Sequence, residues 1–146
     1  MSKASDIHTA LNSLIETTLP GYVKLPDYDH TDNAVINLEK GYRVGISSAV
    51  NDTDIVCQGN IRIQRTFTIA LTNVYVANLD PNYREGLERD LMDDAFTLIQ
   101  QIECNPTLGG VSVNSSYSDD GGIEYLNTDD KQFIAIFLNV VVDYFE

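Results

Sequence analysis

The residues whose types and spacing suggest chemistry gather in one short acidic segment. It holds three carboxylates and an imidazole within six positions: Asp27, Asp29, His30 and Asp32. Hard divalent cations such as Ca²⁺ take carboxylate ligands, so a metal site is one interpretation of this segment. The match to a calcium-binding loop is poor, because the glycine and the closing glutamate of that motif are missing. We therefore expect a loop of solvated acids, with no metal ion and no other cofactor.

Nucleophilic catalysis finds little support in the histidines and cysteines, which are His8, His30, Cys57 and Cys104. A nucleophile needs a neighbouring base, yet the chain has no G-x-S-x-G, H-E-x-x-H or Cys-His signature. We expect His8 to be a partly exposed helix residue and both cysteines to be structural free thiols. The sequence therefore indicates a protein that is not an enzyme.

Charge narrows the class of partner. The 146 residues carry 22 Asp and Glu against nine Lys and Arg, a formal net charge of −13. Since Lys and Arg supply most affinity for phosphates, nonspecific DNA binding by the whole molecule is disfavoured. Four of the bases lie close together in the middle of the chain, namely Lys40, Arg43, Arg62 and Arg65. A basic patch of one molecule can then face an acidic patch of another, although acids on a surface also simply aid solubility.

The element that organises the chain is a long strand over residues 61–76. Apolar side chains at its odd positions alternate with Thr, Ala and Arg at its even positions, which is the pattern of a strand with one buried face. Unbroken, it would span roughly 50 Å. We therefore expect a bend or one end that projects beyond the sheet, and a projecting ribbon suits contact with a neighbouring subunit. Residues 55–57 extend this strand backward in one interpretation.

Two amphipathic helices are expected, over residues 5–18 and 83–103. Pro20 follows the first, while Asp80 and Pro81 suit the cap and first position of the second. In the second helix Leu87, Leu91, Ala95, Leu98 and Ile102 form an apolar stripe, which Phe96 and Ile99 widen.

The remaining strands complete a sheet. We expect one or two strands in residues 33–50, a turn or loop at 51–54, and a strand at 111–117. The Asp-Gly pair in residues 119–122 predicts a turn, after which residues 123–126 pair back. The last strand, residues 131–146, is apolar on both faces in its first half, as in a central strand.

These elements predict an α+β fold: a mainly antiparallel sheet with two helices packed on it, two-layer, as a single domain over residues 1–146. The N-terminus lacks an apolar signal core, and the longest apolar run, Phe133–Leu138, is too short to cross a bilayer. We expect a soluble, unexported protein with no membrane contact.

Five segments, in their order and spacing, resemble the tail terminator proteins of long-tailed bacteriophages, a family also called tail completion or minor tail proteins. The segments are Leu19–Tyr22 after a short helix, Lys40–Val44 before an acidic loop, Arg65–Thr72 before a long acidic helix, Asp119–Tyr125, and Phe133–Leu138 with Val142–Glu146.

This resemblance implies a structural virion protein of the tail and neck, assembled in the host cytoplasm. Such proteins form a ring, typically a hexamer, on the head-proximal end of the tail tube. The ring ends tube polymerisation and offers a joining surface to head-completion proteins, and genome DNA passes through its lumen during ejection. An acidic lumen would let DNA slide without specific binding, since it repels phosphates.

A ring needs two different surfaces on each subunit, because head-to-tail contacts close by rotation. Our candidate interface residues are Arg62 and Arg65 on the long strand, facing the acids Asp90, Asp93 and Asp94 of the next subunit.

Three other functions compete with this one. The nearest is another head-tail connector or neck ring protein. A small metal-dependent hydrolase would use the acids of residues 27–32, and a cellular adaptor domain would dimerise through the last strand.

Overall fold

The elements follow one another as a helix, a long strand hairpin, a second helix and a second hairpin. The computed structural model describes residues 3–24, 40–57, 60–75, 81–127 and 132–145. Their bounds are α1 Lys3–Thr18, β1 Val23–Lys24, β2 Lys40–Cys57, β3 Asn60–Tyr75, α2 Pro81–Cys104, the short 3-10 helix η2 Leu108–Gly110, β4 Asn114–Asn127 and β5 Gln132–Phe145.

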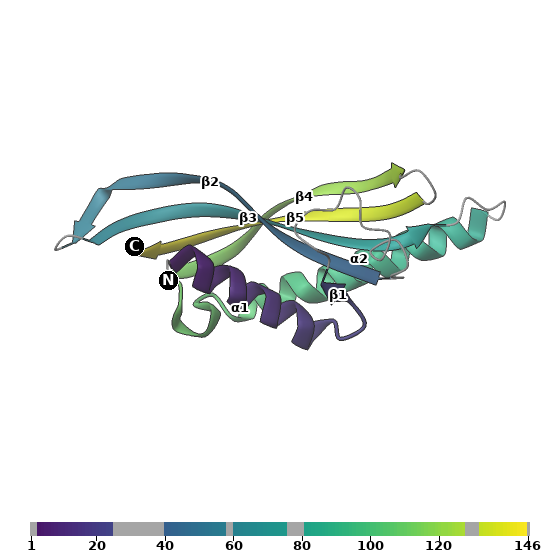
Figure 1. Ribbon diagram of the computed structural model, residues 1–146, viewed down its shortest axis with the longest axis horizontal. Coiled ribbons are helices and arrows are strands. Elements are labelled where there is room, and N and C mark those ends of the chain that lie inside the picture. Colours follow the sequence, from purple (N-terminus) through teal and green to yellow (C-terminus); the bar gives the residue numbers. More distant parts are fainter. Residues whose placement is uncertain (1–2, 25–39, 58–59, 76–80, 128–131, 146) are drawn as a thin grey trace.

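The five described strands form one mixed sheet in the order β1-β2-β3-β5-β4. Two-residue β1 pairs in parallel with β2, and the three other neighbouring pairs are antiparallel. Both helices lie on the same side of the sheet (Figure 1). The chain therefore forms an α+β domain, as the sequence predicts.

The alternation predicted for the long strand is present in β3. Phe67, Ile69 and Leu71 are fully buried on the side that faces the helices. The pairing of β3 with β5 runs from Arg62 to Tyr75 without a register shift, so the alternation is never interrupted. The hairpin of β2 and β3 extends past the start of α1 (Figure 1). β3 pairs with β5 as far as Arg62, so only Asn60 and Ile61 of β3 lie beyond the described end of β5.

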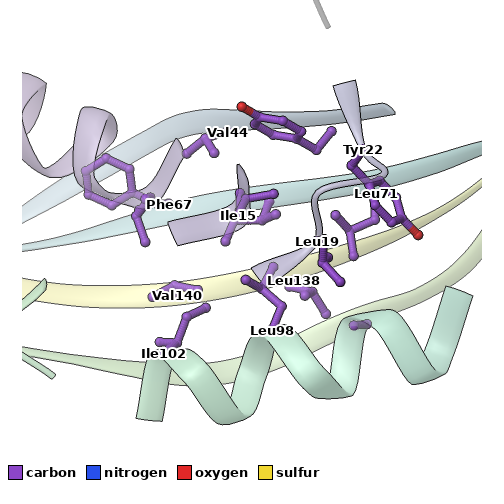
Figure 2. Close-up of a cluster of buried hydrophobic side chains, with 14 of the residues drawn as sticks. Ile15, Leu19, Tyr22, Val44, Phe67, Leu71, Leu98, Ile102, Leu138 and Val140 are labelled. Atoms are coloured by element: carbon purple, nitrogen blue, oxygen red, sulfur yellow. The ribbon is translucent and has the colours of Figure 1, made fainter. Parts of the chain in front are cut away.

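The core forms between the helices and this face of the sheet. Ile7, Leu11 and Ile15 recur on one side of α1 and are fully buried. In α2, Leu98 and Ile102 point toward Leu138 and Val140 of β5 (Figure 2). Each fully buried aliphatic side chain contributes roughly 1.5–3 kcal/mol, so this contact between helices and sheet is the main source of stability.

β5 lies inside the sheet, as predicted, and its even positions from Ile134 to Tyr144 are all buried. Its other face is buried less completely than expected. Ala135 is fully buried there, whereas Phe133 and Phe137 are only half-buried. Burial on both faces is therefore confirmed at Ala135 alone.

The turn or loop expected at residues 51–54 is wrong. β2 runs without a break from Lys40 to Cys57, and its register shifts between Ile46 and Ala49 and again between Asp52 and Val56. Extra residues at a bulge give the same polar sequence signal as a turn. Residues 55–57 thus belong to β2, where Val56 and Cys57 pair with β3, rather than extending β3 backward.

The turn expected at residues 119–122 is also wrong. β4 follows β5 along its whole length, with register shifts between Tyr117 and Asp119 and between Asp120 and Ile123. Gly122 has a φ of 78°, which glycine adopts without steric cost, so the glycine serves a bulge instead of a turn. The strand expected at residues 111–117 begins only at Asn114.

Phe96 does not widen the core stripe of α2, contrary to prediction. Leu91, Ala95 and Leu98 are buried, but Phe96 is 60% exposed and Met92, one turn earlier, is 54% exposed. The cause is angular, because each residue turns about 100° around the helix. Position 96 therefore falls on the outer flank of the helix. The cap expected at Asp80 lies outside the described residues.

Candidate functional site

The residues first considered for chemistry do not form a described catalytic or metal site. The acidic segment 27–32 lies outside the described residues. Within the described ranges, no group of three or more His, Cys, Asp or Glu residues is arranged to hold a metal ion. Cys104 is an exposed free thiol. No helix in the described part of the chain is long and apolar enough to cross a membrane.

His8 joins α1 to the sheet. Its Nε2 lies 2.8 Å from the carbonyl oxygen of Val44, and its Nδ1 lies 3.1 Å from the side-chain nitrogen of Asn12. The neutral tautomer with hydrogen on Nε2 satisfies both contacts, since Nε2 then donates and Nδ1 accepts. His8 is thus the half-buried helix residue predicted, with a structural role.

The positions of the two candidate arginines lie on opposite faces of β3. Positions 62 and 65 are three apart in a strand whose pairing with β5 has no register shift, so backbone alternation assigns them to opposite faces. Arg65 belongs to the side that faces the helices, where its Nε donates to the Tyr144 hydroxyl at 3.0 Å. Positions 62 and 65 therefore do not lie on one face of β3, and the contact of these arginines with acids of a neighbouring subunit stays a prediction.

The three candidate aspartates of α2 also differ from one another. Asp90 and Asp93 are exposed. Asp94 acts within the chain: its Oδ2 accepts a hydrogen bond from the Tyr22 hydroxyl at 2.7 Å and lies 3.8 Å from Lys40 Nζ. The Lys40 ammonium also lies 5.5 Å from the centre of the Tyr22 ring, within the range of a cation-π contact.

This contact is one of three tyrosine-carboxylate pairs that join the helices to the rest of the fold. The Tyr42 hydroxyl donates to Glu16 at 2.6 Å, and the Tyr125 hydroxyl donates to Glu88. Burial, followed by the bond to the carboxylate, raises the pKa of Tyr22 well above its ordinary value of 10.0, and the same causes raise that of Tyr42. Sequence reasoning missed these pairs, because each joins residues far apart in the chain.

A second stripe runs along the outer flank of α2. It consists of Met92, Phe96, Ile99 and Glu103, spaced so that they share one side of the helix; we call it the outer stripe. Glu103 Oε1 accepts the backbone N–H of Tyr117 at 2.9 Å. Tyr117 belongs to β4, which stands at one end of the order of the described strands. The outer stripe therefore lies beside one edge of the sheet.

An exposed apolar residue also lies on the opposite edge. Ile46 of β2 pairs with the buried Phe67, so it shares the side of the sheet that faces the helices, yet it is 49% exposed. Arg65 lies on this same side, one alternation step beyond Phe67.

No protein-family model matches this chain, and no curated protein sequence matches it. The function is therefore inferred from the residues and their arrangement.

Proposed function

We propose that this chain is a structural virion protein of the tail terminator class. Its copies form a ring, with six as the expected number, at the head-proximal end of a phage tail tube. The ring ends tube polymerisation and offers the joining surface for head-completion proteins. In this proposal the α+β domain is a two-layer unit with a mainly antiparallel sheet, and its long hairpin reaches toward the neighbouring subunit.

The observation that carries the proposal is the projecting hairpin of β2 and β3 (Figure 1). On the face toward the helices Val142 and Tyr144 of β5 stay buried beside this hairpin, but Ile46 of β2 is 49% exposed. A small domain gains nothing by itself from a strand pair that extends beyond its core. A neighbouring subunit that packs on the extension would supply the missing cover.

Charge supports a structural role around DNA. A net charge of −13 disfavours adhesion to phosphates and suits a lumen through which DNA slides. The proposal assigns the chain no enzymatic activity and no cofactor. It places the protein in the tail and neck of the virion after assembly in the host cytoplasm.

The test is a polymerisation assay with the cognate tail tube protein. Tubes are grown with and without this chain, and their lengths and ends are measured by electron microscopy. We expect the chain to stop growth and to be found at one end of each tube. Unchanged tube growth with no bound chain would contradict the proposal. Binding to the head connector without any effect on tubes would instead favour a neck ring.

A further inference from the structure

We propose that the outer stripe of α2 docks a basic amphipathic helix of a partner protein. The partner helix brings apolar side chains onto the centre of the stripe and Lys or Arg side chains onto its acidic ends. This inference goes beyond the proposed function, because it concerns one face of a single copy and holds whether or not the copies close a ring.

The centre of the outer stripe is uncovered. Met92 and Phe96 are the two most exposed large apolar side chains of the described residues, at 54% and 60%, and they lie one turn apart. Ile99, on the next turn, packs partly on the core. Exposed apolar side chains that adjoin one another often mark an interaction site, whereas scattered ones need no explanation.

The spacing of the stripe indicates that a helix is the fitting occupant. Its residues, at 92, 96, 99 and 103, are separated alternately by four and three positions, and the same alternation continues back through Arg89 and Glu85. This is the repeat of a seam along which two helices pack, with side chains of one helix filling spaces between those of the other. The stripe that faces the sheet, at 91, 95, 98 and 102, has the same alternation and is buried. The chain's own sheet thus covers one seam of α2 and leaves the outer one largely exposed.

Charge selects a basic partner. Glu85 and Glu103 stand at the two ends of the outer seam, and Asp93 lies beside Phe96; all three acids are exposed, whereas Arg89 adds one positive charge. Cations on the partner helix meet these acids, since complementary charges favour one partner over others. The same acids repel phosphates, which disfavours nucleic acid and anionic membranes as occupants.

A second copy of this chain does not fit the seam. If two outer seams pack antiparallel with their apolar centres together, Glu85 of one copy faces Glu103 of the other. If they pack in parallel, each glutamate faces its own counterpart. Both arrangements bring like charges together, and each copy carries a net charge of −13. The occupant is therefore a different protein.

α2 presents this seam on a fixed helix. Asp94 accepts the Tyr22 hydroxyl at 2.7 Å, and Glu103 Oε1 accepts the Tyr117 N–H at 2.9 Å, so α2 is held both near its middle and at its end. A carboxylate has about four acceptor sites, so the bond at Glu103 leaves room for a cation of the partner. A face that is ordered before contact loses less entropy on binding.

Binding of two designed peptides tests the inference. Both are synthetic helical peptides of about three heptads with Leu at the a and d positions; one carries Lys at the e and g positions and the other carries Glu there. Each labelled peptide is titrated with the whole chain, and fluorescence anisotropy gives the Kd. We expect the Lys peptide to bind with a Kd of roughly micromolar size and the Glu peptide to bind at least about tenfold more weakly.

The apolar part of the contact is tested by Phe96→Ser, with Val23→Ser in β1 as the matched control. Both side chains are exposed, at 60% and 49%, so neither change removes a core residue. We expect Phe96→Ser to weaken binding of the Lys peptide by roughly tenfold, as the loss of a central apolar anchor does, and Val23→Ser to leave it unchanged. Circular dichroism confirms that both variants are folded.

The charged part is tested by Glu103→Gln, which removes the charge but keeps a side-chain oxygen for the Tyr117 N–H. Its matched control is Glu124→Gln, because Glu124 is an exposed acid of β4 outside the outer stripe. We expect Glu103→Gln to weaken binding of the Lys peptide by about threefold, the size of one exposed ion pair, and Glu124→Gln to leave it unchanged.

Several results would overturn the inference. They are equal affinity for the two peptides, no binding of the Lys peptide up to about 1 mM, and affinity that Phe96→Ser leaves unchanged. Self-association of the chain without peptide, seen by sedimentation and abolished by Phe96→Ser, would assign the stripe to a second copy and overturn it as well. None of these measurements uses tail tubes, so failure here is distinguishable from failure of the proposed function.

Discussion

At the residue scale, the side chains first expected to carry intermolecular contacts partly serve the fold itself. Asp94 was a candidate for meeting a neighbouring subunit, yet it receives the Tyr22 hydroxyl and lies near Lys40. Glu16 and Glu88 likewise accept hydrogen bonds from Tyr42 and Tyr125. Acids on a helix surface can thus be structural even in a strongly acidic protein.

Sequence reasoning identified the acids but not these roles. Helical periodicity shows which residues leave the core stripe, and it contains no information on which distant hydroxyl approaches them. The separation of 72 residues between Tyr22 and Asp94 illustrates the difficulty. The tyrosines themselves are the available signal, since a buried hydroxyl usually finds a partner.

Replacement of Tyr22 by Phe tests this role. We expect the free energy of unfolding to fall by about 1 kcal/mol near neutral pH, the usual value of a hydrogen bond. The folded state raises the pKa of Tyr22. The wild-type contribution is therefore complete below pH 10 and is lost as pH rises above it, because the unfolded chain then releases the proton first.

The difference between wild type and Tyr22→Phe should accordingly narrow above about pH 10, by up to ~1.4 kcal/mol per pH unit. Urea unfolding of both proteins at several pH values measures this difference in the free energy of unfolding. A difference that stays constant to about pH 11 would contradict a raised pKa in the folded protein.

At the element scale, the structure departs from the sequence pattern where strands bulge. Both helices and the long strand follow from periodicity, because their apolar residues recur at clear intervals over many positions. The full lengths of β2 and β4 do not follow from periodicity. The polar and glycine residues at 51–54 and 119–122 suit a turn and a bulge equally well. Whether such residues form a turn or a bulge depends on which strand pairs beside them.

Two glycines provide a matched test of this interpretation. Gly122 has a positive φ of 78° in β4, whereas Gly86 lies in α2, and an added Cβ would meet nothing within 4 Å at either position. We expect Gly122→Ala to lower the free energy of unfolding by about 1 kcal/mol or more through backbone strain. Gly86→Ala should raise it by roughly 0.5–1 kcal/mol, because alanine is the better helix former.

Thermal and chemical unfolding of both variants measures these changes. Equal effects at the two positions would show that Gly122 does not need its positive φ, and that β4 continues through residues 119–122 without the bulge.

At the scale of the whole molecule, the two edges of the sheet differ in chemistry. Toward the β2 end of the strand order Ile46 is exposed, and at the β4 end the outer stripe with Glu103 lies beside the sheet. The order β1-β2-β3-β5-β4 creates this difference by separating the two hairpins across the sheet. The sequence pattern predicts which segments form strands. It does not predict which surfaces lie at opposite ends of the sheet, because the strand order depends on pairing between residues far apart in the chain.

The central claim is that copies of this chain close a ring at the end of a tail tube. The most direct test is electron microscopy of tubes grown in its presence, with averaging of end-on views. The proposal predicts a closed ring of one defined copy number, expected to be six, with an open lumen at one tube end. Copies bound along the tube wall, or an assembly that never closes, would contradict it.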